Sequence, residues 1–233
     1  MAIAVGTIAL IAILILLSPI FRIQEVFIVG IERVNESEVR ERLNLNYTSN
    51  IFLLNTNTVR TRIMGNPYVA NVTFRRELPN TIHIIVHERR LSAYMEHMPG
   101  SFLFLDDFGH VLEVRSSFTE PLPLLVGLSF TRFQVGEILD VPIATNFAAV
   151  VQYTQSLAAH GLLDQITHIN VSDPSNIRIL VNYLDFHVGT AQNADEKVRT
   201  IAEMLKTFPD PTIIRGSVDI REIRAEYFLT LLQ

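Results

Sequence analysis

The chain contains no cysteine, and this absence excludes several kinds of site together. Thiolate zinc sites, iron–sulfur clusters, cysteine nucleophiles and disulfide bonds all require that side chain. The absence says nothing against an oxidising compartment, because a protein there can do without disulfides.

Charge is missing from the N-terminal end. Residues 2–21, AIAVGTIALIAILILLSPIF, contain no Asp, Glu, Lys or Arg. Twenty helical residues extend about 30 Å, the thickness of a bilayer's hydrocarbon core. A cleaved signal peptide is the alternative, but the apolar run is long and no A-x-A site precedes Arg22. The pattern predicts a transmembrane anchor over residues 1–21. A count of the arginines that follow the run would leave the rest of the chain in the cytoplasm.

Catalytic motifs are also missing from the sequence. G-x-S-x-G, Walker A and G-x-G-x-x-G do not occur, and the ten glycines are scattered. His83 and His87 lie on a predicted strand, where their spacing separates them by about 13 Å, too far for one metal ion. Asp106 and Asp107 indicate a hairpin turn rather than a carboxylate pair. We therefore expect no catalytic, metal or cofactor site.

The charge balance changes near residue 90. Residues 22–90 carry ten Arg against seven Glu, whereas residues 91–233 carry nine basic and seventeen acidic side chains. Such a break favours a domain boundary there.

Residues 24–90 predict the order strand, helix, helix, strand, strand. The first strand ends at Gly30, and Asn35 is expected to cap a helix with Glu38 as its capping-box partner. The second helix ends near Gly65 and Pro67. Two strands follow, with Tyr68, Ala70, Val72 and Phe74 facing the helices and Val69, Asn71, Thr73 and Arg75 on the wetter face. Because the arginines lie at strand ends, the pattern does not indicate a nucleic-acid site.

Residues 91–233 predict a mixed, β-rich domain with helices, and the fold class of the whole chain is α+β. A hairpin is expected around Asp107, a helix after Pro142, and strands on both sides of the turn 173–176. Asn193 is expected to cap a further helix with Glu196 as its partner. The closing segment predicts a strand with Tyr227 and Phe228 near its end, and periodicity alone leaves an edge strand and an internal strand equally open.

Several segments of the sequence resemble the FtsQ/DivIB family of bacterial cell-division proteins. They are VFIVGIERVNESEVRERL, NIFLLNTNTVRTRI and NPYVANVTFRRELPNTIHIIVHERRLSAY, followed by weaker matches to the end of the chain. The resemblance covers nearly the whole chain, although Leu91 stands where the family usually has proline. It implies a transmembrane anchor over 1–21, a POTRA domain over 22–90 and a β domain over 91–233.

The resemblance also implies a function and its partners. It implies a divisome scaffold in the inner membrane, with most of the chain extracytoplasmic, that regulates septal peptidoglycan synthesis without being an enzyme. The partners would be small bitopic coiled-coil proteins, FtsB/DivIC-like and FtsL-like, with the septal synthase complex reached indirectly. The implied partner-binding residues are Tyr68, Arg75, Arg76, Ile223, Arg224, Ala225, Glu226, Tyr227 and Phe228. A membrane-anchored wall hydrolase and a POTRA adaptor of an export system are the alternatives.

Overall fold

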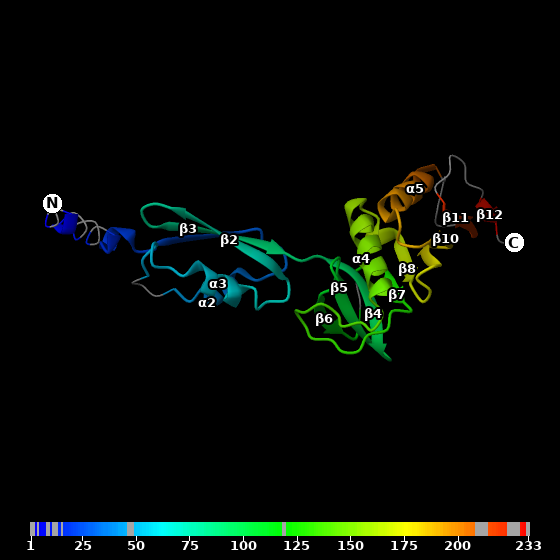
Figure 1. Ribbon diagram of the computed structural model, residues 1–233, viewed down its shortest axis with the longest axis horizontal. Helices are drawn as coiled ribbons and strands as arrows, with labels where there is room; N and C mark the ends of the chain where they lie inside the picture. The colour runs from blue at the N-terminus through cyan, green and yellow to red at the C-terminus, as the bar shows by residue number, and fades with distance from the viewer. Residues whose placement is uncertain are drawn as a thin grey trace. The chain divides into compact units, whose positions relative to one another are not determined.

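The computed structural model divides into two compact units, Met1–Arg89 and Arg90–Gln233 (Figure 1). It describes residues 3, 5–7, 10, 14, 16–45, 49–117, 120–207, 214–222 and 229–231. Within those ranges no helix is both long enough and apolar enough to cross a membrane. Much of the anchor predicted over residues 1–21 lies outside the described residues.

Unit 1 has the predicted order of elements. It contains a 3₁₀ turn (Pro19–Phe21), β1 (Glu25–Val29), α2 (Glu36–Leu43), α3 (Thr56–Ile63), β2 (Val69–Glu77) and β3 (Thr81–Glu88). The three strands form one sheet in the order β1-β3-β2, with β1 parallel and β2 antiparallel to β3. The predicted β-α-α-β-β pattern is confirmed.

The cap of α2 differs in one respect from the prediction. The side chain of Asn35 accepts a hydrogen bond from Ser37 N at 2.9 Å, as an N-cap should. The predicted capping box is wrong, because the carboxylate of Glu38 is used elsewhere. It accepts from Arg42 Nε and from Asn66 Nδ2, each at 2.9 Å, and thereby ties α2 to the end of α3.

One face of the three-stranded sheet packs against α2 and α3. The buried cluster comprises Val34, Val39, Leu43, Val59, Ile63, Val69, Val72, Ile84 and Val86. Val69 is part of this core, so its assignment to the wetter face was wrong. The pairing of β2 with β3 shifts between Val69 and Asn71, and this bulge moves Val69 to the inner face.

Unit 2 is built on one large sheet. Its strands are β4 (Leu91–Met98), β5 (Ser101–Asp106), β6 (Val111–Arg115), β7 (Leu124–Val126), β8 (Ile166–Asn170), β9 (Ile177–Val181), β10 (Leu184–Gly189), β11 (Gly216–Asp219) and β12 (Leu229–Leu231). They lie in the order β12-β11-β10-β9-β8-β7-β4-β5-β6, with parallel and antiparallel pairs mixed. The α+β class with a mixed sheet is confirmed.

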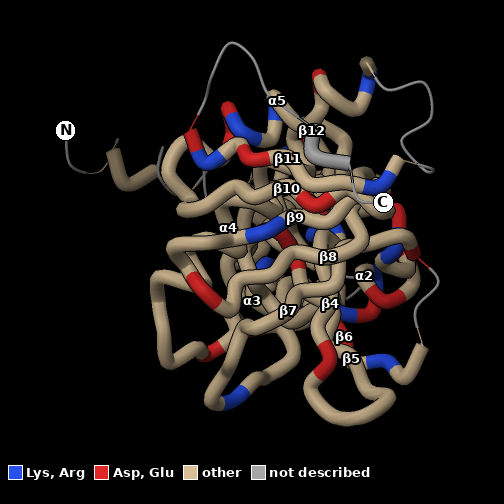
Figure 2. The backbone as a smooth tube through the Cα atoms, turned by 90° about the vertical axis from the view of Figure 1, so that its right-hand side faces the viewer, with Lys and Arg blue, Asp and Glu red and all other residues tan. Residues whose placement is uncertain are grey.

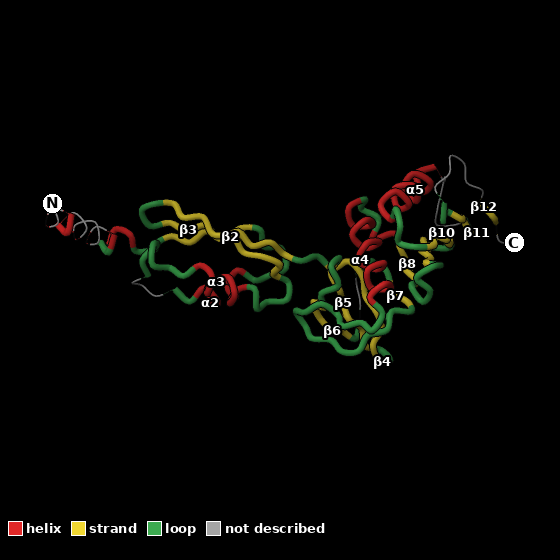
Figure 3. Tube along the Cα trace, in the orientation of Figure 1, coloured by secondary structure: helices red, strands yellow, loops and turns green. Residues whose placement is uncertain are grey.

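Two helices, α4 (Ala144–Ala159) and α5 (Ala194–Thr207), lie beside each other against this sheet (Figure 3). Their apolar side chains join those of the strands in a single buried cluster. Asn193 does not have the predicted capping geometry, because its φ of 56° is left-handed rather than extended. Neither α4 nor α5, the two α-helices that the structure describes in unit 2, covers the opposite face of the sheet.

Candidate functional site

The resemblance places partner-binding residues on or beside β2 of unit 1 and in residues 223–228, directly before β12 of unit 2. β2 and β12 each stand at the end of their sheet order. A strand in that position offers backbone N–H and C=O groups to an incoming segment. The geometry of each edge decides which of them is accessible.

The three predicted residues on or beside β2 do not form one patch. Tyr68 and Arg76 are eight residues apart, which is roughly 26 Å along a strand. Tyr68 is half-buried beside the core, and the guanidinium of Arg33 lies 5.9 Å from the centre of its ring. Arg75 is exposed opposite His83, on the sheet face away from the helices.

Arg76 forms hydrogen bonds within unit 1. Its Nε donates to Ile51 O at 2.9 Å, and another guanidinium nitrogen donates to Leu54 O at 3.3 Å. The side chain therefore fastens the loop between the two helices to the end of β2. A partner would have to compete with these two bonds.

At Val72 the backbone groups on the outer edge of β2 already have hydrogen-bond partners. Asn71 Oδ1 accepts from Val72 N at 2.8 Å, and Arg60 Nε donates to Val72 O at 2.9 Å. Both backbone groups of Val72 are thus satisfied by side chains rather than by another strand. At the other edge of the sheet, Arg40 donates to Val26 O at 3.2 Å. A strand added at either edge would have to displace an arginine.

The closing segment of the chain is described in part. Residues 223–228, which include six predicted partner-binding residues, lie outside the described residues. Directly after them, β12 pairs antiparallel with β11, and Thr230 stands opposite Ser217. No described strand pairs with the far side of β12.

The opposite end of the same sheet is covered. Val111 N in β6 donates to Glu137 O at 2.9 Å, and Gly136 N donates to Val111 O at 2.7 Å. The segment before α4 thus occupies part of the β6 edge. As far as the described residues show, β12 is the more accessible end of the sheet.

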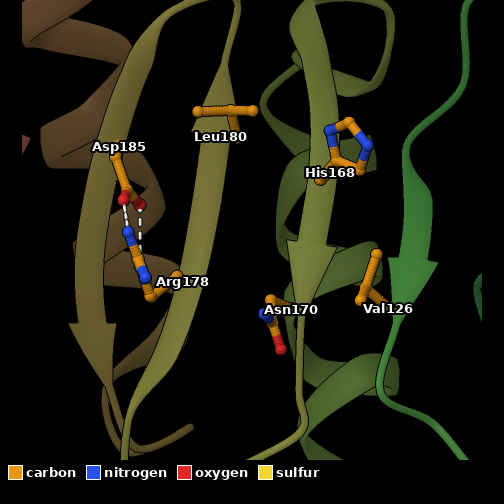
Figure 4. A pocket seen from close by; sticks show the side chains of 6 residues that line it. All are labelled: Val126, His168, Asn170, Arg178, Leu180 and Asp185. Carbon is orange, nitrogen blue, oxygen red and sulfur yellow. Dashed lines mark hydrogen bonds and ion pairs between the residues drawn. The ribbon is translucent and has the colours of Figure 1, made fainter.

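The face of the sheet away from α4 and α5 has a groove of about 340 Å³ (Figure 4). It is lined by Val126, His168, Asn170, Arg178, Leu180 and Asp185. Arg178 and Asp185 form an ion pair across β9 and β10, with Arg178 Nε 3.1 Å from Asp185 Oδ1. His168 Nδ1 is buried without a hydrogen-bond partner. This surface was not predicted from the sequence, because strand alternation does not show which strands are neighbours.

Charged groups continue from this groove towards β12. Arg178, His187 and Asp219 stand opposite one another on β9, β10 and β11, where Figure 2 marks both basic and acidic positions. Burial, together with the positive charge of Arg178, lowers the pKa of His187. The hydrogen bond from Arg221 lowers the pKa of Asp219 to about 2. The row therefore consists of paired charges and a neutral imidazole near pH 7.

One imidazole–carboxylate pair of unit 2 lies at the turn between β5 and β6. Asp106 Oδ1 accepts from Phe108 N at 2.9 Å and His110 N at 2.8 Å, which is the hairpin turn expected from the sequence. The ring of His110 binds the same carboxylate, at 3.0 Å. In the part of the chain that the structure describes, no group of His, Asp or Glu side chains could hold a metal ion.

Comparison with known proteins extends over both units. Residues 21–89 match the POTRA domain of the FtsQ type. Cell division protein DivIB of Clostridium acetobutylicum is 26% identical over 188 residues, which are 80% of this chain and 74% of that protein. DivIB of Clostridium tetani is 26% identical over 194 residues, 80% of this chain and 71% of that protein.

A second group of relatives has a different name. Cell division protein FtsQ of Rickettsia bellii is 32% identical over 159 residues, 68% of this chain and 57% of that protein. The resemblance drawn from the sequence is confirmed: the chain carries a POTRA domain of the FtsQ type and is a relative, over most of its length, of the DivIB and FtsQ cell division proteins.

Proposed function

We propose that the chain is a scaffold of the bacterial division machinery that binds other division proteins and has no catalytic role of its own. The observation that carries this proposal is the extent of the likeness. The relatives named cell division proteins match 80% of the chain, so the likeness continues well beyond residues 21–89. A POTRA adaptor of an export system would share the first unit alone.

The partners proposed from the family resemblance are two small bitopic coiled-coil proteins, FtsB/DivIC-like and FtsL-like. The docking segment would be Ile223–Phe228 together with β12, to which a partner adds one strand. Two features support this choice over the edges of unit 1. β12 ends the large sheet, whereas Arg60 and Arg40 donate to carbonyls of the two edge strands of unit 1. Tyr68 and Arg75 remain a proposed second contact surface.

The proposed location follows from the apolar run over residues 2–21 and from the resemblance. The run would anchor the chain in the inner membrane, with both units on the extracytoplasmic side. Regulation of septal peptidoglycan synthesis would then be indirect, through the partners that the scaffold holds. A membrane-anchored wall hydrolase would instead need a catalytic cleft, and the groove between Val126 and Asp185 lacks a nucleophile paired with a base.

A proline scan of the closing strand tests the proposal. Proline removes one backbone N–H, so at alternate positions it removes either a bond to β11 or a bond offered to the partner. We expect prolines at every second position between Arg224 and Leu231, those whose N–H points away from β11, to abolish capture of the two coiled-coil proteins. The thermal midpoint of these variants should stay nearly unchanged.

The alternate positions serve as matched controls in this scan. A proline there removes a hydrogen bond to β11 and should lower the thermal midpoint. Capture that survives every proline would refute strand addition at this edge. Loss of capture only in variants that also unfold would show that the strand is internal.

A further inference from the structure

One end of unit 1 exposes large apolar side chains. The exposed fractions are 58% for Ile20, 40% for Phe52, 69% for Leu53 and 58% for Leu78. Single exposed apolar residues are ordinary, but a group of them at one end of a domain indicates a contact surface. We call these four residues the apolar tip.

Backbone hydrogen bonds bring the segments of the apolar tip together. Ile51 N donates to Phe21 O, and Gln24 N donates to Asn80 O, each at 2.9 Å. The rings of Phe21 and Phe52 meet edge to face, with their centres 5.1 Å apart. Figure 1 shows the turn between β2 and β3 at the end of unit 1 from which the N-terminal residues emerge.

The segments that carry the apolar tip contain no charged residue. Residues 43–59, which include the loop between α2 and α3, have no Asp, Glu, Lys or Arg, and neither does the turn 78–80. Charged side chains border these segments: Arg22 pairs with Asn50, Arg76 bonds to Ile51 O and Leu54 O, and Glu77 precedes Leu78. An uncharged apolar tip bordered by charged side chains suits the interfacial layer of a lipid bilayer, where apolar groups are buried and charged groups stay at the headgroups.

The loop is also fixed to the apolar run itself. Asn50 Nδ2 donates to Leu16 O at 2.8 Å. Leu16 lies five residues before the end of the run, and the chain between Leu16 and Phe21 forms a bend and a 3₁₀ turn. If the run enters a bilayer, the loop beside Leu16 lies at the depth where hydrocarbon meets headgroups. The lipid that surrounds Leu16 would then also contact Phe52 in this loop.

We propose that the apolar tip of unit 1 inserts into the surface layer of the bilayer beside the anchor. This inference rests on the proposed function, in which residues 1–21 anchor the chain. Insertion gives the POTRA domain a second attachment to the membrane besides the chain itself. Arg76, which bonds to Ile51 O and Leu54 O, holds the inserting loop in place.

Tryptophan fluorescence tests the proposal, because the chain has no tryptophan and every introduced one is a single reporter. The full chain is reconstituted into phosphatidylcholine–phosphatidylglycerol vesicles, with acyl chains that are plain, brominated near the headgroup to report on the tip, or brominated at mid-chain to report on residue 14. Phe52→Trp and Leu53→Trp report on the apolar tip. Met64→Trp is the matched control, because Met64 is 39% exposed and follows α3, about 12 Å from the loop.

We expect the tip variants to show blue-shifted emission in vesicles and a loss of fluorescence with brominated lipid, and Met64→Trp to show neither. Leu14→Trp, within the apolar run, separates the two proposals. Strong quenching at residue 14 with no more quenching at 52 and 53 than at 64 would overturn the inserted tip alone. Vesicles that fail to retain the chain, with no quenching at residue 14, would overturn the anchor and the tip together.

Discussion

Glu88 Oε1 accepts a hydrogen bond from the backbone nitrogen of Val34, 2.9 Å away and 54 positions earlier in the chain. The same carboxylate also accepts from Glu32 N and Arg33 N, each at 2.9 Å. Three consecutive N–H groups of the turn before α2 thus converge on one side chain at the end of β3. Glu88, which belongs to one of the segments that resemble the FtsQ/DivIB family, therefore has an architectural role.

Replacing Glu88 by alanine should destabilise unit 1. The change removes three charge-assisted hydrogen bonds, and we expect a loss of roughly 1–3 kcal/mol in the free energy of unfolding, measured in urea. Glu77→Ala is the matched control, because Glu77 is exposed at the other end of the β2–β3 hairpin. Equal effects of the two substitutions would show that the converging N–H groups add nothing to stability.

Two adjacent isoleucines test the register of β3. Ile84 is fully buried in the core of unit 1, whereas Ile85 is half-buried on the opposite face. Ile84→Ala should cost about 2–5 kcal/mol, and Ile85→Ala should cost clearly less, because the first substitution leaves a cavity in the core. Chemical denaturation of the two variants measures the difference. A larger cost at Ile85 would place the strand one residue out of register.

The two lysines of the chain, Lys197 and Lys206, both lie on α5 but should react differently. Lys197 is 3% exposed, and its Nζ donates to Val188 O at 2.7 Å and Thr190 O at 2.9 Å, while Lys206 is exposed. We expect an amine-acylating reagent to modify Lys206 quickly and Lys197 only after denaturation, as read by mass spectrometry. Burial lowers the pKa of Lys197, which by itself would favour reaction, so protection of this amine would be due to its inaccessibility. Similar rates at both positions would contradict the burial of Lys197.

Stability should depend on Asp219 in acid. The pKa of this carboxyl falls from 3.8 to about 2 on folding because Arg221 donates hydrogen bonds to it. A lowered pKa means that the folded state favours the carboxylate, so the stabilisation is present above about pH 4 and is lost as the pH falls towards 2. Because the side chain is 54% exposed, we expect at most about 1 kcal/mol.

Thermal unfolding of Asp219→Asn, compared with the unchanged chain between pH 5 and pH 2, measures this contribution. The two curves should differ above pH 4 and converge in acid. A constant difference across that range would show that the ion pair with Arg221 does not produce the pH dependence.

Local patterns predicted the first unit well. Asn35 capped its helix as expected, and the alternation of β3 gave the buried positions of Ile82, Ile84 and Val86. Two errors arose from contacts between distant residues. Glu38 turned to Asn66 instead of its own helix cap, and the bulge after Val69 reversed one side chain.

Local sequence patterns predicted the second unit less completely. β4, which lies between β7 and β5, was not predicted, since LSAYMEHM alternates weakly and its burial depends in part on β7, more than 20 residues further along the chain. Tyr153 was also missed on the buried face of α4, although it is fully buried and donates to Thr190 O at 2.9 Å. The groove around His168 requires neighbours from four strands, and their order in a mixed sheet does not follow from local sequence.

The arginine bonds at Val72 and Val26 have a consequence for how many copies can join. A chain of identical molecules that grows by strand pairing needs two open edges on every molecule, one for each neighbour. Here arginines bond to both edge strands of the small sheet, and residues 136–137 bond to Val111 on the β6 edge of the large one. Among the described edge strands, β12 is the one without such a bond, so the proposed strand addition there would occur once and give a complex of fixed size rather than a fibre.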